Sequence, residues 1–191
     1  MTHALSSVAV VTGAASGIGR ALAQQLSMQG ANLALSDVNM EALEETASIL
    51  RGTGKVTLQK LDVADRGAWE AYAEQVKADH GQVDMIINNA GVALSETVER
   101  MSYEDMEWIV NINFWGVVYG TKSFLPLLKE RPESAIVNVS SIFGIIALPT
   151  QAAYNATKFA VRGFTESLRQ ELKGTNVFVT TVHPGGIKTN I

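Results

Sequence analysis

The chain has 191 residues, of which 47% are hydrophobic and 18% are charged, with a formal net charge of -4 and no cysteine. This composition excludes a disordered chain, a collagen-like repeat and a disulfide scaffold, and it suffices for one domain over residues 1–191. No run of Lys or Arg supplies the basic surface that nucleic acid or anionic lipid would bind. We therefore expect neither nucleic acid nor a membrane as a partner.

Residues 1–4 lack the charged and apolar stretches of a signal peptide, and no segment has the length needed to span a bilayer. The expected location is therefore the cytoplasm. The three histidines lie far apart in the sequence and there is no cysteine. This pattern predicts no metal site.

Short apolar runs alternate along the chain with longer segments of helical periodicity. The expected strands are 8–11, 33–36, 56–61, 83–88, 136–140 and 177–182. The expected helices are 19–29, 40–50, 66–79, 103–129 and 151–173. Such alternation predicts parallel strands, and nearly continuous apolar strands predict helices on both faces of the sheet. The expected fold is a doubly wound α/β sheet.

A glycine-rich segment, 12–19, follows the first expected strand and leads into a helix. Gly13 lets the chain turn off the strand, Gly17 permits close approach of a diphosphate, and Gly19 lets the helix pack on the sheet. The remaining loop positions that we expect at the diphosphate are Ser16 and Ile18. The spacing departs from G-x-G-x-x-G, so an ordinary glycine-rich turn is the alternative interpretation.

Asp37 ends the second expected strand, 18 residues beyond Gly19, where an acid can bond the ribose hydroxyls of adenosine. A carboxylate there repels a 2'-phosphate, so NAD is favoured over NADP. Arg20 is the one basic residue nearby. A helix cap or turn is the alternative role for Asp37.

Two further strand ends carry candidate cofactor contacts. Asp62 can bond the adenine edge and Val63 can contact the ring, although turn chemistry also explains Asp62. Small residues follow the fourth expected strand, at the crevice where parallel sheets bind ligands; they are Asn89, Ala90 and Gly91. A plain loop is the alternative for this segment.

Tyr154 and Lys158 are four residues apart in a helical pattern, so both side chains lie on one face. An ammonium group beside a phenol favours the phenolate, which can exchange a proton with an alcohol. A pair on the surface of an amphipathic helix is the alternative interpretation.

Together these motifs resemble the short-chain dehydrogenase/reductase family over essentially the whole chain. The resemblance rests on 12–19, 88–91, Asn113, Ser141, 154–158 and Pro184-Gly185. It implies a Rossmann-type fold and an oxidoreductase that transfers a hydride between NAD(P) and an alcohol or carbonyl group. It also implies continuation for several dozen residues, so we expect a C-terminal strand and a substrate loop to be missing here.

The resemblance also implies roles for single residues. Tyr154 would be the general acid/base, Lys158 would bind the nicotinamide ribose, and Ser141 would hold the substrate oxygen, with Ser140 as the alternative. Asn113 would keep a water and the lysine in a proton relay, unless it faces solvent; Asn111 fits the spacing less well. The loop after the last strand would meet the nicotinamide through Pro184, Gly185, Ile187 and Thr189. The alternative is that this segment only ends the strand and begins a loop.

The residues that would flank the pocket are mostly apolar, which favours an apolar secondary alcohol or ketone: Val92, Ala93, Leu94, Ile142, Phe143 and Ile145. Small or apolar residues on two helices resemble the family's dimer interface and predict a homodimer or homotetramer, unless burial in one subunit explains them: Ala152, Ala156, Ala160, Val117 and Phe124. Two other functions stay open, an NADP-dependent carbonyl or 3-oxoacyl-thioester reductase and a non-catalytic NAD-binding sensor.

Overall fold

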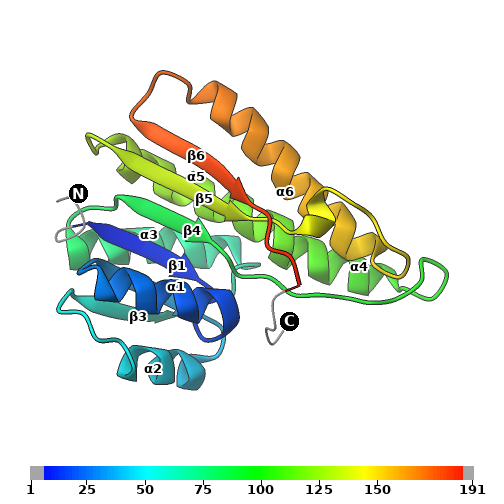
Figure 1. Ribbon diagram of the computed structural model, residues 1–191, viewed down its shortest axis with the longest axis horizontal. Coiled ribbons are helices and arrows are strands. Elements are labelled where there is room, and N and C mark those ends of the chain that lie inside the picture. Colours follow the sequence, from blue (N-terminus) through cyan, green and yellow to red (C-terminus); the bar gives the residue numbers. More distant parts are fainter. Residues whose placement is uncertain (1–6, 187–191) are drawn as a thin grey trace.

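Six parallel strands form one sheet in the computed structural model, which describes residues 7–186 (Figure 1). The strand order is β3-β2-β1-β4-β5-β6. The strands are β1 (Val8–Thr12), β2 (Asn32–Asp37), β3 (Val56–Lys60), β4 (Met85–Asn88), β5 (Ser134–Val139) and β6 (Val177–Val182). All six expected strands are present, each within two residues of the expected ends, and the doubly wound α/β fold is confirmed.

Helices connect the strands in the expected alternation. They are α1 (Gly17–Met28), α2 (Met40–Ser48), α3 (Arg66–His80), α4 (Tyr103–Val110), α5 (Gly116–Lys129) and α6 (Ala152–Glu171). A 3-10 turn, η3 (Ile142–Gly144), follows β5. Local chemistry sets several ends: the Asp65 side chain caps α3, and Ser102 and Asp105 form a capping box at α4.

The helix expected over 103–129 is instead interrupted by a π-helical turn, η2 (Asn111–Trp115), between α4 and α5. Within this turn the Gly116 N–H donates to the Asn111 carbonyl, five residues earlier. A π-turn inserts an extra residue into a helix and changes the direction of the side chains on it; such turns are frequent at functional sites. Hydrophobic periodicity did not reveal it, because the apolar residues on both sides remain in helical spacing.

Each face of the sheet has its own apolar core, as the continuous apolar strands predicted. Alternate residues of β1 point to opposite faces: Val10 packs toward α3, α5 and α6, whereas Ala9 and Val11 pack toward α1 and α2. Trp69 of α3 and Phe124 of α5 are fully buried and pack edge to face, with ring centroids 6.4 Å apart.

Buried polar side chains join α5 and α6 to two strands on the same face of the sheet. Asn88 at the end of β4 donates to Thr121 of α5 (3.3 Å) and to Asn138 of β5 (2.8 Å). Asn138 in turn donates to Thr165 of α6 (2.9 Å). These contacts tie α5 and α6 to the strands whose carboxyl ends border the site, since the amides would otherwise be left without partners.

The order of the strands reverses between β1 and β4, which are neighbours in the sheet but far apart in sequence. The segments that follow β1 and β4 therefore diverge at a crevice beyond the carboxyl ends of the strands. This is where the glycine-rich loop and the segment after Asn88 meet.

Candidate functional site

One cavity of about 460 Å³ opens at this crevice. It is lined by the glycine-rich loop, by the ends of β2 to β5, by α6 and by the segment after β6. The expected site residues that line it are Gly13, Ser16, Gly17, Ile18, Asp37, Asp62, Val63, Asn89, Ala90, Gly91, Ser141, Tyr154, Lys158, Pro184 and Gly185. The fold thus brings together residues from almost the whole length of the chain.

The glycine-rich loop needs glycine for conformation and for space. Gly13 and Gly17 have φ values of 64° and 51°, in the left-handed region. A Cβ on Gly13 would lie 2.8 Å from the Ala90 Cα. Gly19 does not line the cavity, and a Cβ there would lie 2.1 Å from the Gly13 carbonyl oxygen and 2.7 Å from the Asn89 amide. Gly19 therefore packs against the loop itself rather than only against the sheet.

The loop is held against the segment after β4. The Thr12 hydroxyl accepts from the backbone N–H groups of Asn89 and Ala90, both at 3.0 Å. The Asn89 side-chain amide donates to the carbonyl oxygens of Thr12 (2.8 Å) and Gly13 (3.2 Å). Asn89 therefore shapes the cavity floor through its contacts with the glycine-rich loop.

The Asp37 carboxylate lines the cavity while its two oxygens accept from backbone N–H groups of Ala15 and Asn39, each at 3.0 Å. The bond from Asn39, two residues later, is the turn contact that was the alternative role for Asp37. The two bonds leave accepting capacity on both oxygens, because a carboxylate offers about four lone-pair sites. Asp37 can therefore hold the loop and still accept bonds from a ligand.

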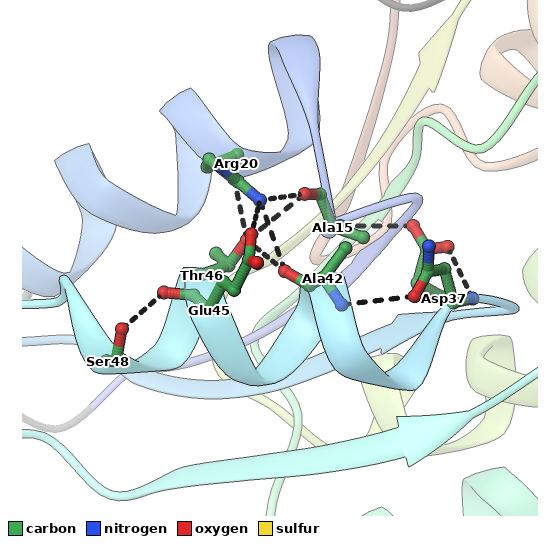
Figure 2. A network of polar contacts seen from close by, with 8 residues as sticks. Ala15, Arg20, Asp37, Ala42, Glu45, Thr46 and Ser48 are labelled. Carbon is green, nitrogen blue, oxygen red and sulfur yellow. Dashed lines mark hydrogen bonds and ion pairs between the residues drawn. The ribbon is translucent and has the colours of Figure 1, made fainter.

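Arg20 does not line the cavity and turns toward α2 (Figure 2). Its guanidinium donates to the Thr46 hydroxyl (2.9 Å) and to the carbonyl oxygens of Ala15 (2.5 Å) and Ala42 (3.2 Å). It also pairs with the Glu45 carboxylate at 3.5 Å. Arg20 is thus engaged between α1 and α2, and Lys60, the neighbour of Asp37 on β3, does not line the cavity either.

Asp62 and Val63 follow β3 and border the cavity. The Asp62 carboxylate accepts from the Ala64 N–H at 2.9 Å, a turn contact. Val63 is buried, and its carbonyl accepts from the indole N–H of Trp69 at 2.9 Å. A Cβ on Gly116 would lie 3.0 Å from the Val63 side chain. The start of α5 therefore supports Val63 from behind.

Tyr154 and Lys158 lie on α6, and the surface-pair interpretation is wrong because Lys158 is only 4% exposed. The Lys158 ammonium lies 5.6 Å from the centre of the Tyr154 ring and donates to the Val139 carbonyl at 3.1 Å. Burial lowers the pKa of Lys158 to about 8, since desolvation disfavours the charged form. The ring of Phe143 packs edge to face on Tyr154, with centroids 6.1 Å apart.

Ser141 and Ser140 follow β5, and both line the cavity. The Ser140 hydroxyl donates to the Lys158 carbonyl (2.9 Å), whereas the Ser141 hydroxyl accepts only from the Phe143 N–H (3.2 Å). The Ser141 hydroxyl proton is therefore the one that remains available for a ligand. This difference favours Ser141 over Ser140, as the spacing predicted.

Asn113 lies in the π-turn and is fully buried, so the solvent-facing alternative is wrong. Its amide makes a pair of bonds with the backbone of Val92, 2.8 Å to the N–H and 2.9 Å to the carbonyl, and donates to Thr157 (3.2 Å). Asn113 does not line the cavity; a Cβ on Gly91 would lie 3.1 Å from its Oδ1 and 3.3 Å from the Lys158 Nζ. It sits directly behind Gly91.

Other expectations have mixed outcomes. Ile187 and Thr189 lie outside the described residues. Of the expected flanking residues, Leu94 and Ile145 do not line the cavity. Four flanking residues do line it: Val92, Ala93, Ile142 and Phe143.

The expected subunit interface is wrong for Val117 and Phe124, which are buried in the chain's own core. The exposed aromatic residues of α4, η2 and α6 are instead Tyr103, Trp108, Trp115 and Phe159, each more than 40% exposed. Ala152 and Ala156 are exposed near them on α6. Exposed tryptophan on packed helices is unusual for a surface without a partner.

The sequence reasoning missed two side chains. Gln151 lines the cavity, and His183 bonds the Ser141 carbonyl through Nδ1 at 3.0 Å. Each stands beside an identified motif, three residues before Tyr154 and one before Pro184. Proximity to those motifs was the available signal.

The residues present fit a dinucleotide cofactor. The left-handed Gly13 and Gly17 leave a concave backbone where any Cβ on Gly13 would collide with Ala90, and the first N–H groups of α1 face this loop. The Ser16 side chain caps none of them. Asp37 and Asp62 supply acceptors for hydroxyl and amino groups at the far end.

Comparison with known proteins identifies the family. The family described as short chain dehydrogenase matches residues 7–191. The chain belongs to the short-chain dehydrogenase family. Within this family it is 52% identical over 187 residues to the protein named SadH of Mycobacterium tuberculosis, covering 96% of this chain and 68% of that one.

Two other members of the short-chain dehydrogenase family are each 37% identical over 183 residues, 95% of this chain. They are cyclopentanol dehydrogenase of Comamonas testosteroni and the 3-oxoacyl-[acyl-carrier-protein] reductase FabG of Thermotoga maritima, of which 73% and 74% are covered. A solved short-chain dehydrogenase/reductase of Burkholderia phymatum in complex with NAD superimposes with a TM-score of 0.96 at 33% identity, covering all of this chain and 69% of that one. This chain is therefore an oxidoreductase of the family, with the Rossmann-like fold that binds NAD(P).

None of the helices within residues 7–186 combines the length and apolar character needed to cross a bilayer. In the same part of the chain, no group of three or more His, Asp or Glu residues is placed to hold a metal ion.

Proposed function

We propose that this short-chain dehydrogenase transfers a hydride between NAD(H) and an apolar secondary alcohol or ketone, with Tyr154 as general acid/base. The observation that carries the proposal is the shared cavity: Ser141, Tyr154 and Lys158 line the same space as the glycine-rich loop. A bound nicotinamide supplies or accepts the hydride. The cofactor and catalytic residues belong, in this proposal, to one domain over residues 1–191.

The chain's own residues manage the proton and orient the reacting oxygen. The Tyr154 hydroxyl gives its proton to the carbonyl oxygen during reduction and takes it back during oxidation. The Ser141 hydroxyl accepts a bond from the Phe143 N–H, so it can donate a hydrogen bond to the same substrate oxygen as negative charge develops there. The Lys158 ammonium, held by the Val139 carbonyl, favours the phenolate form of Tyr154 and binds the nicotinamide ribose.

Asn113 contributes indirectly in this proposal. Its amide fixes the backbone of Val92, next to Gly91, and Thr157, next to Lys158. It thereby holds the two sides of the ribose position at a constant separation. The water and lysine relay implied by the family resemblance would run past this amide.

The preference for NAD rests on charge near the adenosine end. Asp37 faces the cavity with a carboxylate that would repel a 2'-phosphate, and Arg20 is engaged by three groups of α2 and one carbonyl of the glycine-rich loop. No Lys or Arg other than Lys158 is among the described residues that line the cavity. A 2'-phosphate would therefore meet a negative charge without a compensating positive one. The cofactor contacts we propose also include Ile187 and Thr189.

The preference for an apolar substrate rests on the wall beside Tyr154, which is built from Val92, Ala93, Ile142 and Phe143. Burial of a hydrocarbon against such a wall stabilises the complex by about 25 cal/mol per Å². The relative that acts on cyclopentanol supports a small cyclic alcohol as the first substrate to test. Similarity to the relative named as a 3-oxoacyl reductase supports a second candidate function for this chain, the NADP-dependent reduction of a 3-oxoacyl thioester.

The test measures absorbance of reduced nicotinamide with NAD and NADP in parallel, using the full-length protein. The substrates are cyclopentanol, cyclohexanol and 2-octanol, with a 3-hydroxyacyl thioester as the competing class. The proposal expects turnover of the apolar alcohols with NAD. Turnover confined to NADP and the thioester would favour the second candidate, and tight NAD binding without turnover of any substrate would favour the non-catalytic sensor.

We also propose that two copies of the chain associate through the face of α4, η2 and α6, as a homodimer or as part of a homotetramer. The support is the exposed Trp108, Trp115 and Phe159 on helices that pack side by side. Light scattering of the wild type and Trp115→Glu tests this: the variant is expected to shift to monomer. An unchanged mass for the variant would exclude this face.

A further inference from the structure

The cavity contains one polar side chain that neither the cofactor nor the proton transfer uses. Gln151 lines it at the residue before α6, and its side-chain amide has no hydrogen-bond partner among the described residues. The hydroxyl of Ser140, which also lines the cavity, already donates to the Lys158 carbonyl. Gln151 therefore presents both a free donor and a free acceptor.

The backbone beside Gln151 is held in a strained conformation. Thr150 has φ 64°, the only positive φ of a non-glycine residue among those described. A β-branched residue in the left-handed region is a genuine outlier, and such outliers cluster at functional sites. Contacts from the segment after β4 hold it there: the Glu96 N–H donates to the Thr150 carbonyl (2.8 Å) and the Ser95 and Thr150 hydroxyls lie 3.2 Å apart.

This arrangement determines where Gln151 stands. The two segments that flank the apolar wall, 92–96 and 145–151, are joined at Thr150, so the next residue enters α6 from a fixed direction. Gln151 and Tyr154 are three residues apart in sequence, and both line the same cavity. One substrate can therefore contact the Gln151 amide while its reacting oxygen bonds Tyr154.

The charge of the cavity defines what this amide can bind. Lys158 is the only cationic residue lining it among those described, and it is buried against Val139. Within residues 7–186, no cation other than Lys158 lines the cavity to pair with a carboxylate or phosphate on the substrate. A neutral hydroxyl or carbonyl would pair with the amide, which can donate or accept.

We propose that Gln151 is a specificity residue that binds a second, neutral oxygen of the substrate, a hydroxyl or carbonyl group separated from the reacting carbon by a short hydrocarbon span. This inference rests on the proposed function. The preferred substrates are then cyclic or short-chain diols, diketones and hydroxyketones rather than simple alcohols. The hydrocarbon between the two oxygens packs against Val92, Ile142 and Phe143.

The experiment compares reduction of cyclohexanone and cyclohexane-1,4-dione by NADH in the full-length protein. The two ketones differ in one carbonyl group. Because the dione has two equivalent reacting carbons, its kcat/KM should be about twice that of cyclohexanone even without a bond to Gln151. With the Gln151 bond, the wild type is expected to favour the dione by a further factor of about five. Gln151→Met keeps the length of the side chain and removes its polar atoms, so the ratio should fall to about two.

Gln170→Met, on the exposed part of the same helix, is the matched control and should keep the wild-type ratio. A ratio of about two in the wild type, or the same raised ratio in Gln151→Met, overturns the role of Gln151 and leaves the proposed function intact. Absence of turnover of both ketones, together with inactivity toward the apolar alcohols, overturns the proposed function itself. The two failures are therefore distinguishable.

Discussion

His183 Nδ1 lies 3.0 Å from the carbonyl oxygen of Ser141, the serine whose hydroxyl faces the cavity. Backbone bonds flank this contact, from Ser140 N–H to the Val182 carbonyl (2.8 Å) and from Ile142 N–H to the Pro184 carbonyl (2.9 Å). The segment carrying Ser141 is therefore attached to the segment after β6 at three successive residues. The imidazole is the only side chain in this attachment.

His183 is thus expected to act as a positioning residue for Ser141. His183→Leu should lower kcat for the alcohol about tenfold, because the serine hydroxyl loses its fixed direction. KM and the affinity for NAD should change little. His183→Asn, whose amide N–H can reach the same carbonyl, should restore most of kcat. Equal losses of kcat in the Leu and Asn variants would contradict a positioning role.

Asp37→Asn tests the basis of cofactor choice. The amide removes the negative charge and keeps one acceptor oxygen, which can bond the N–H of Ala15 or of Asn39, whereas the carboxylate bonds both. The ratio of the Kd values for NADP and NAD should fall by about 10- to 100-fold, since repulsion of the 2'-phosphate is lost. Titration calorimetry with each cofactor measures it. Asp65→Asn, which caps α3 outside the cavity, is the control, and an Asp37→Asn ratio equal to that control would refute the assignment.

Burial of Lys158 predicts a pH dependence of stability. Its folded-state pKa of about 8 lies below the model-peptide value of 10.5 that applies to the unfolded chain. Between these values the unfolded chain binds more protons, so the free energy of unfolding attributable to Lys158 rises with pH. Below pH 8 both states are protonated and the destabilisation is constant.

Urea unfolding of wild type and Lys158→Met at pH 7.5 and 10 checks this sign. The stability of the wild type relative to the variant should rise by an amount on the order of 1–3 kcal/mol over this interval. The comparison removes the contributions of other titrating groups, such as Tyr72, whose pKa is raised by burial. A relative stability that stays flat or falls over the interval would show that Lys158 is not desolvated.

Asn113 and Asn111 differ in a way that substitution can expose. Asn113→Leu leaves the N–H and carbonyl of Val92 buried without partners, which should reduce the free energy of unfolding by about 2–4 kcal/mol and lower turnover. Asn111→Leu replaces an exposed side chain in the same π-turn and should change stability by less than about 0.5 kcal/mol. Similar losses in both variants would refute the role assigned to the Asn113 amide.

The sequence predicted the sheet, the helices and most cavity-lining residues, because these depend on local patterns. Short, nearly continuous apolar runs mark the strands, and glycine at Gly13 and Gly17 marks backbone that other residues rarely adopt. The spacing of Tyr154 and Lys158 is likewise a property of one helix. These features are encoded within a few consecutive residues.

Features that depend on contacts between distant segments were not predictable. The engagement of Arg20 by α2, the contact of His183 with Ser141 and the left-handed Thr150 all arise where two loops meet. The π-turn at Asn113 is invisible to periodicity because the extra residue is accommodated without an interruption in the apolar pattern. Each of these required the packed chain.

Hydride transfer by Tyr154→Phe tests the central claim most directly. The variant keeps the ring that packs against Phe143 and removes only the hydroxyl, so NAD binding should stay within about threefold of wild type. Oxidation of cyclopentanol, followed by absorbance of reduced nicotinamide, should fall by about 10²- to 10⁴-fold. Retained oxidation in a variant that binds NAD normally would contradict the assignment of Tyr154 as the general acid/base.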